Sequence, residues 1–147
     1  MIKIICVGKI KEKYLKDAIL EYKKRISKYT KIEIIEVSDE TDNILNKERD
    51  SIYRFIKEKD YVITLEIEGK EISSLEFAQK IDKTFISYPN ITFIIGGSYG
   101  LHKDIKNRSN FSLSFSKMTF PHPLFRVLLL EQIYRAFKIN HHETYHK

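Results

Sequence analysis

The sequence predicts a single α/β domain, built as a sandwich in which helices cover both faces of a parallel β-sheet. Five short segments are dense in β-branched and other apolar residues, and stretches with helical periodicity or helix-start signals separate them. Nearly continuous apolar strands are typical of parallel sheets, because both faces of such a sheet are covered. The chain has no internal repeat and no linker rich in Pro, Gly or Ser, so we expect one domain over residues 1–147.

The first half of the chain alternates strands and helices. Its strands are expected at residues 2–7, 32–37 and 61–66, all rich in Ile or Val. Between the first two strands, apolar residues recur at spacings of three and four, which predicts one face of an amphipathic helix. These residues are Leu15, Ala18, Tyr22, Ile26 and Tyr29. A weaker helix is expected at about 44–58.

The second half continues the alternation. Ser73 and Glu76 form a capping-box pattern, which predicts a helix that runs toward Tyr88 and ends before Pro89. The remaining strands are expected at 91–95 and 111–115, with a short polar helix at 102–109 between them. A final helix is expected at about 124–139.

The final predicted helix is apolar over an arc of roughly 200°, about twice what one side of a sheet requires. The surplus favours a homodimer through residues such as Leu129, and the alternative is a central helix in a monomer. Arg126 falls within this arc and needs a partner, which we expect to be a carboxylate of the other subunit or an RNA phosphate. Arg135 has two alternatives, a pair with Glu131 four residues earlier or a contact with RNA.

Charge is unevenly distributed along the chain. Residues 1–31 carry a net charge of +7, residues 32–100 carry −6, and residues 101–147 carry +5. Basic ends favour a nucleic-acid partner, although solvated helix faces also favour Lys. The apolar runs near the start are too short for a membrane span or a secretory signal, so we expect a cytoplasmic protein. A single cysteine, Cys6, can form no internal disulfide, and we expect no metal site.

Three segments follow predicted strands and are candidates for a ligand site, because ligands of open parallel sheets bind beyond the carboxyl ends of the strands. They are residues 65–70, 95–100 and 115–123. Adjacent Gly96 and Gly97 leave room for a ligand to lie directly on the backbone, or else serve only a tight turn. The glycine spacing matches neither the dinucleotide fingerprint nor the Walker loop, and the glycines come late in the chain. An ordinary Rossmann site is therefore not expected.

The motifs at 94–101 and 113–123 and the ending Tyr145-His146-Lys147 resemble those of the ribosomal RNA large-subunit methyltransferase H family, within the SPOUT superfamily. The resemblance spans essentially the whole chain, although the stretch at about 38–46 looks shorter than usual. It implies a minimal SPOUT domain whose C-terminal segment forms a deep trefoil knot. It also implies a homodimer that uses S-adenosylmethionine to methylate N3 of a pseudouridine in 23S rRNA on assembled ribosomes.

The resemblance also implies site residues. Those expected to bind the cofactor are Leu65, Gly96, Phe115, Ser116, Lys117, Met118, Thr119 and Phe120. His122, Tyr145, His146 and Arg135 are candidates for assisting loss of the imide proton or for gripping the nucleotide. Alternatively, His122 only braces the loop between two prolines. The tail at Tyr145 and His146 is expected to become ordered when RNA binds.

Two other functions remain open from the residues. The chain could be a non-catalytic ribosome-binding or RNA-binding protein with the same fold, which the intact glycines and the 115–120 loop argue against. It could also be a nucleotide-dependent α/β enzyme that acts on a small molecule. The basic ends and the missing phosphate-binding glycines argue against this second alternative.

Overall fold

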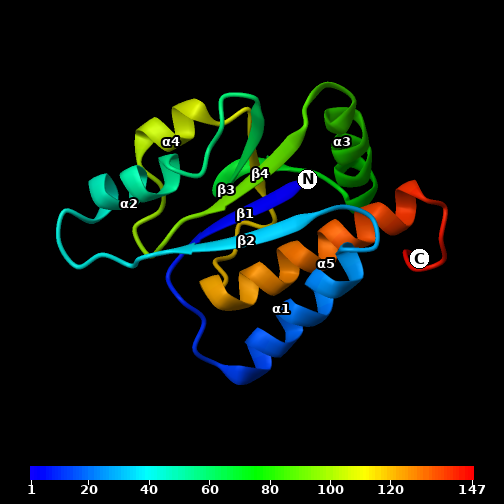
Figure 1. Cartoon of the computed structure of the whole chain (residues 1–147), viewed down its shortest axis with the longest axis horizontal. Coiled ribbons are helices and arrows are strands. Elements are labelled where there is room, and N and C mark those ends of the chain that lie inside the picture. The colour runs from blue at the N-terminus through cyan, green and yellow to red at the C-terminus, as the bar shows by residue number, and fades with distance from the viewer.

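The computed structural model describes all 147 residues and has a three-layer α/β arrangement, as the sequence predicts (Figure 1). The strands are β1 (Ile2–Val7), β2 (Ile32–Val37), β3 (Asp60–Glu71), β4 (Asn90–Ile95) and β5 (Phe111–Ser114). The helices are α1 (Lys13–Ile26), α2 (Ile44–Tyr53), α3 (Ser74–Ser87), α4 (Lys103–Arg108) and α5 (His122–Asn140). No helix is both long and apolar enough to span a bilayer.

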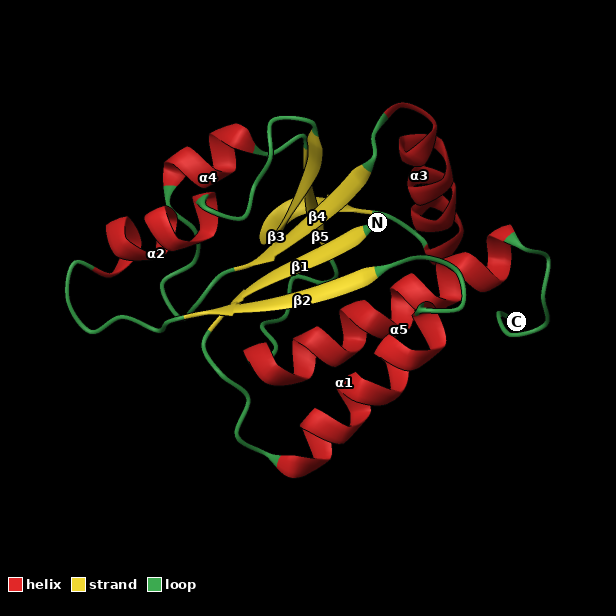
Figure 2. Ribbon diagram, viewed as in Figure 1, coloured by secondary structure: helices red, strands yellow, loops and turns green.

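All strand pairs are parallel, in the order β2-β1-β4-β3-β5 (Figure 2). Helices α1, α3 and α5 cover one face of this sheet, and contribute residues such as Ile26, Ile81 and Leu129 to the larger of two apolar clusters. Helices α2 and α4 cover the other face and contribute Ile52 and Ile105 to the smaller cluster. Both faces are therefore buried, which explains why the strands read as nearly continuous apolar runs.

Two helix boundaries differ from those predicted. Helix α2 ends at Tyr53, five residues early, and the freed carbonyl of Phe55 accepts a hydrogen bond from Lys3 Nζ at 2.6 Å. Helix α5 begins at His122, because a proline is tolerated in the first turn, where its missing N–H has no helical partner. The predicted capping box of α3 is confirmed, with Ser73 Oγ accepting from the backbone N–H of Glu76 and the Glu76 carboxylate accepting from that of Ser73.

Helix α5 lies in the middle of its layer, between α1 and α3 (Figure 1). Its Leu129 and Ile133 are completely buried within the single chain. The predicted dimer contact through Leu129 is therefore wrong. Its wide apolar arc is explained within one chain, because the sheet covers one side and two flanking helices cover others.

The expected partner of Arg126 is also corrected. Arg126 is 4% exposed and its Nη1 pairs with Glu36 Oε2 of the same chain at 2.7 Å. Its Nη2 donates to the carbonyls of Val7 and Gly8, at 3.1 and 2.7 Å. Neither a second subunit nor RNA is required to satisfy this charge, and the first turns of α5 are joined to the ends of β1 and β2.

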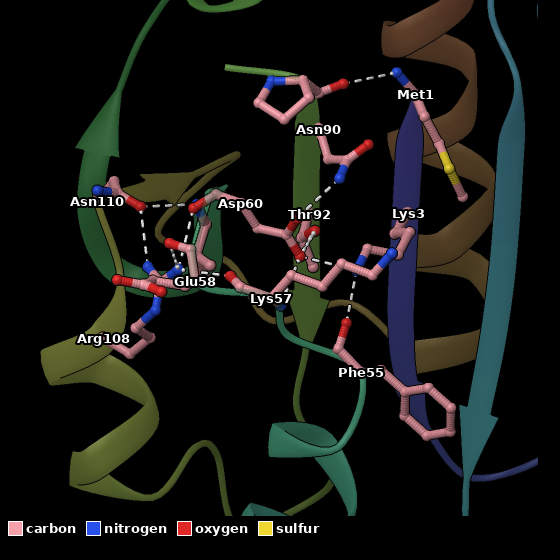
Figure 3. A network of polar contacts seen from close by, with 12 residues as sticks. Met1, Lys3, Phe55, Lys57, Glu58, Asp60, Asn90, Thr92, Arg108 and Asn110 are labelled. Atoms are coloured by element: carbon pink, nitrogen blue, oxygen red, sulfur yellow. Dashed lines mark hydrogen bonds and ion pairs between the residues drawn. The ribbon is translucent and has the colours of Figure 1, made fainter. Parts of the chain in front are cut away.

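A buried polar network joins the opposite, amino-terminal ends of three strands (Figure 3). Lys3 Nζ of β1 pairs with Asp60 Oδ2 of β3 at 2.7 Å, and both side chains are almost fully buried. The Asp60 carboxylate also accepts hydrogen bonds from Asn90, Thr92 and the backbone N–H of Lys57. Burial alone would raise the pKa of Asp60, but these donors outweigh burial and hold the pKa below its ordinary value. The network lies away from the strand ends at which a ligand is expected.

Candidate functional site

A cavity of about 410 Å³ lies beside residues 65–68 of β3 and the carboxyl ends of β4 and β5. This falls within the range of about 300–1,000 Å³ that is typical of small-molecule and cofactor sites. All three candidate segments line it. The predicted cofactor residues in its wall are Leu65, Gly96, Phe115, Ser116, Met118, Thr119 and Phe120. Lys117 is exposed and does not line the cavity.

A bulge in β3 forms one wall. The register of β3 against β5 shifts between Leu65 and Lys70, so the intervening residues leave the ladder and border the cavity. Gly69 allows the strand to return, because a Cβ at this position would lie 2.8–2.9 Å from backbone atoms of Ser112 and Leu113. The sequence prediction ended the strand at residue 66 and missed this return. A glycine within a strand pattern was the available signal.

The glycine loop after β4 forms the floor. A Cβ on Gly96 would lie 2.8 Å from the carbonyl oxygen of Gly100, so the turn itself requires glycine here. Gly100 donates its N–H to the Gly97 carbonyl and adopts a φ of 77°, in the left-handed region that favours glycine. The glycines thus serve a tight turn, and the same bare backbone borders the cavity.

The loop between β5 and α5 forms the remaining wall. Ser114 Oγ donates to the Ser116 carbonyl, and Ser116 Oγ accepts from the backbone N–H of Met118. The rings of Phe115 and Phe120 pack on Phe125 of α5, with centroids 4.9 and 6.0 Å away. Local hydrogen bonds and aromatic packing therefore give this loop a defined shape beside the cavity.

His122 begins α5 and also lines the cavity. No hydrogen bond fixes its ring. Burial, and next the nearby Arg126 guanidinium, lower its pKa, while Asp39 opposes the shift. The imidazole is therefore neutral at neutral pH and can accept a proton from a ligand in the cavity.

A polar pair that sequence reasoning missed also lines the cavity. The Glu66 carboxylate accepts hydrogen bonds from Thr64 and Ser112, and Lys106 Nζ lies 3.4 Å from its Oε1. Burial opposes the charge, but the two hydroxyl donors and Lys106 hold the pKa of Glu66 below its ordinary value. No motif signalled this pair, because β3 and α4 bring the two residues together only in the folded chain.

The other three candidate catalytic residues form a separate cluster near the end of α5. Arg135 Nε donates to Glu131 at 2.9 Å, so of the two predicted alternatives the structure shows the pair with Glu131. Arg135 Nη1 also lies 3.0 Å from His146 Nδ1. Tyr145 Oη donates to Glu131 at 3.2 Å, and its ring packs on Tyr134. Burial and the neighbouring Glu131 charge raise the pKa of Tyr145 to about 12, so this hydroxyl stays protonated.

The expected disorder of the tail in the absence of RNA is contradicted by these contacts, because aromatic and ionic partners on α5 already hold it. None of Arg135, Tyr145 and His146 lines the cavity that holds His122. Along the axis of α5, Arg135 lies about 20 Å from His122 at a rise of 1.5 Å per residue. No group of three or more His, Cys, Asp or Glu side chains could hold a metal ion.

The fold and the cavity define a class of α/β enzymes with the ligand site in the second half of the chain. The glycine turn after β4 and the loop before α5 hold the ligand there, whereas an ordinary dinucleotide-binding fold uses a phosphate-binding loop after its first strand. Sequence comparison agrees with this class. The family described as "Predicted SPOUT methyltransferase" matches residues 1–146. The chain belongs to the SPOUT methyltransferase family, whose members use S-adenosylmethionine.

Curated relatives cover the full chain. Proteins named ribosomal RNA large subunit methyltransferase H are 55% identical in Clostridium novyi and 52% identical in Streptococcus uberis, each aligned over 99% of both chains. The protein of that name in Caldicellulosiruptor saccharolyticus is 51% identical over all of both chains. The resemblance stated from the motifs is therefore confirmed.

Solved structures agree on the fold alone. A probable methylase family protein from Haemophilus influenzae superposes with a TM-score of 0.59 at 14% identity, over 99% of this chain and 70% of that one. The SpoU methyltransferase AviRb from Streptomyces viridochromogenes superposes with a TM-score of 0.51 at 9% identity, over 98% and 62%.

Proposed function

We propose that this protein transfers a methyl group from S-adenosylmethionine to N3 of a pseudouridine in 23S rRNA, acting on assembled ribosomes. The names of the full-length relatives support the RNA substrate. The observation that carries the proposal is the cavity, because it gathers the three segments that the motifs single out into one site. The nucleotide and the assembled state of the ribosome come from the family resemblance.

The lining suits an adenosyl group. Leu65 and Phe115 offer apolar surface to a purine, while the turn at Gly96–Gly100 and the loop at 115–120 offer backbone polar groups to a ribose. When bound, S-adenosylmethionine supplies a methyl group made electrophilic by its sulfonium. The protein's own task is to position the acceptor nitrogen in line with that methyl group and to exclude water.

The acceptor must lose its N3 proton. His122 is the candidate proton acceptor, because it borders the cavity, is neutral at neutral pH and has no competing hydrogen bond. Tyr145 stays protonated and suits a hydrogen-bond donor, while Arg135 and His146 suit contacts to the nucleotide or its phosphate.

We propose a homodimer, for which the separation of the two clusters is the argument. His122 borders the cavity, whereas Arg135, Tyr145 and His146 lie near the far end of α5 of the same chain. If both clusters act on one nucleotide, the tail cluster of a second subunit must approach the cavity of the first. We also propose the knotted passage of the C-terminal segment that the resemblance implies, and a cytoplasmic location, where the ribosomal substrate is found.

The decisive experiment is methylation of ribosomes that lack this modification, with mass spectrometry to locate the new methyl group. We expect one methyl group on N3 of a single pseudouridine of 23S rRNA. Binding of S-adenosylmethionine without transfer to any RNA would refute the catalytic proposal. Absence of both cofactor binding and transfer, with ribosome binding retained, would identify a non-catalytic binding protein.

A further inference from the structure

Four charged residues are buried in this chain: Lys3, Asp60, Arg126 and Glu48. The first two pair with each other, and Arg126 pairs with Glu36. Glu48 of α2 is 3% exposed, yet no Lys, Arg or His forms an ion pair with it. A buried carboxylate without a cation is costly, so its persistence calls for an explanation.

The surroundings of Glu48 increase this cost. Burial, and next the charge of Asp39, raise its pKa, and Glu40 adds to the repulsion although its backbone donates a hydrogen bond. Both acidic neighbours belong to the segment between β2 and α2. Nothing in the chain supplies the positive charge that this carboxylate lacks.

The carboxylate lies against the floor of the cavity. A Cβ on Gly97 would lie 3.5 and 3.6 Å from the two carboxylate oxygens, and 3.1 Å from Val7 Cγ1. Gly97 also lines the cavity, so one bare glycine separates the buried charge from the ligand space. A Cβ at this position would be in van der Waals contact with the carboxylate, which shows how close the charge lies to the glycine backbone.

We propose that Glu48 is a positioning residue whose charge, acting through the glycine turn, makes the cavity prefer a positively charged sulfonium donor over the neutral thioether product. This inference rests on the proposed function, because it takes the ligand to be S-adenosylmethionine. The donor has a fixed positive charge on sulfur, and S-adenosylhomocysteine has none. Donor and product otherwise differ only by the methyl group. A nearby negative charge therefore favours binding of S-adenosylmethionine and release of S-adenosylhomocysteine.

The effect is tested by isothermal titration of the purified full-length protein with both compounds. Glu48→Gln keeps the shape of the side chain and removes its charge. We expect about a tenfold loss of affinity for S-adenosylmethionine, as for opposite charges separated by a layer of backbone at an effective dielectric constant of about 20. Affinity for S-adenosylhomocysteine should change less than twofold.

The matched control is Asp50→Asn, which removes the same charge from the same helix at a side chain that is 65% exposed and pairs with Arg49. It should alter neither affinity. Retained binding of S-adenosylhomocysteine shows that Glu48→Gln is folded. Sinefungin has a carbon that bears a positively charged amine where the donor has its methylated sulfur. It should bind the wild type about tenfold more tightly than S-adenosylhomocysteine, a test that needs no variant.

Equal weakening of both ligands by Glu48→Gln would assign Glu48 a merely structural role and overturn this inference while leaving the proposed function intact. A wild type that binds sinefungin and S-adenosylhomocysteine equally would overturn it as well. Failure of the wild type to bind any of the three compounds would instead overturn the proposed function, and this inference with it.

Discussion

Removing either partner of the buried Lys3–Asp60 pair should destabilise the fold strongly and unequally. Lys3 has two acceptors, the Asp60 carboxylate at 2.7 Å and the Phe55 carbonyl at 2.6 Å. The Asp60 carboxylate has four donors: Lys3 Nζ, the backbone N–H of Lys57, Asn90 Nδ2 and Thr92 Oγ1. Loss of the carboxylate therefore leaves more buried groups without a partner than loss of the ammonium.

Breaking a buried pair typically costs about 3–5 kcal/mol. We place Lys3→Met near the lower end, at about 3 kcal/mol, because three donors still satisfy Asp60. Asp60→Ala should reach about 5 kcal/mol, because it strands the buried Lys3 ammonium together with Asn90 and Thr92. The double variant should be less destabilised than the sum of the two, because each single change leaves the other charge unpaired.

Urea unfolding followed by circular dichroism at one fixed protein concentration measures these differences. The control is Lys13→Met, which breaks an exposed pair with Asp17 on α1 and should leave the unfolding midpoint unchanged. An Asp60→Ala variant as stable as this control, or less destabilised than Lys3→Met, would refute the account of the network.

The same network predicts how stability depends on pH. The folded-state pKa of Asp60 lies below its ordinary value, so its contribution is fully present above the unfolded-state pKa and is lost as pH falls through the folded-state pKa. The free energy of unfolding of the wild type should therefore fall on acidification below about pH 4. Asp60→Asn should show a smaller fall over that range, and an equal fall would contradict the assignment.

Three further changes test the site. His122→Gln should reduce methyl transfer about 10²-fold or more, with cofactor affinity within about twofold of the wild type. Because the pKa of His122 is lowered, wild-type activity should fall only when the pH drops below 6.5, the ordinary pKa of histidine. Unchanged activity of the variant would mean that His122 only braces the loop. Gly96→Val should abolish cofactor binding in titration, since even a Cβ would lie 2.8 Å from the Gly100 carbonyl oxygen, and normal affinity would refute the assigned floor. Deleting residues 145–147 should spare cofactor binding but reduce transfer to ribosomes, and full transfer would exclude the tail from the reaction.

The strands could be predicted from local sequence because their signals are local. Runs such as 2–7 and 32–37 consist mainly of Ile and Val, which is enough to indicate strands of a parallel sheet. The three ligand-facing segments were also predictable, because each comes at the end of an apolar run, although the first of them proves to be a bulge within β3. The return of β3 past Gly69 was not, since it depends on the fit of that glycine against the backbone of β5.

Pairings between distant residues lay outside what periodicity can predict. Arg126 and Glu36 are ninety positions apart, and only the fold places the start of α5 beside the end of β2. The pattern of α5 showed how much apolar surface it carries but not that α1 and α3 would cover it. Glu48 gave no signal, because nothing in its local sequence places it beneath the glycine turn.

The ion pair and hydrogen bonds of Arg126 determine which parts of the cavity can adapt to a ligand. Moving the first turns of α5 would separate an almost fully buried guanidinium from one carboxylate and two carbonyls. The helix that presents His122 is therefore a fixed wall. The residues that can yield are the exposed ones at the rim, such as Tyr99 and Met118. The loops that carry these exposed residues should accommodate differences in ligand size, while the imidazole of His122 stays in place.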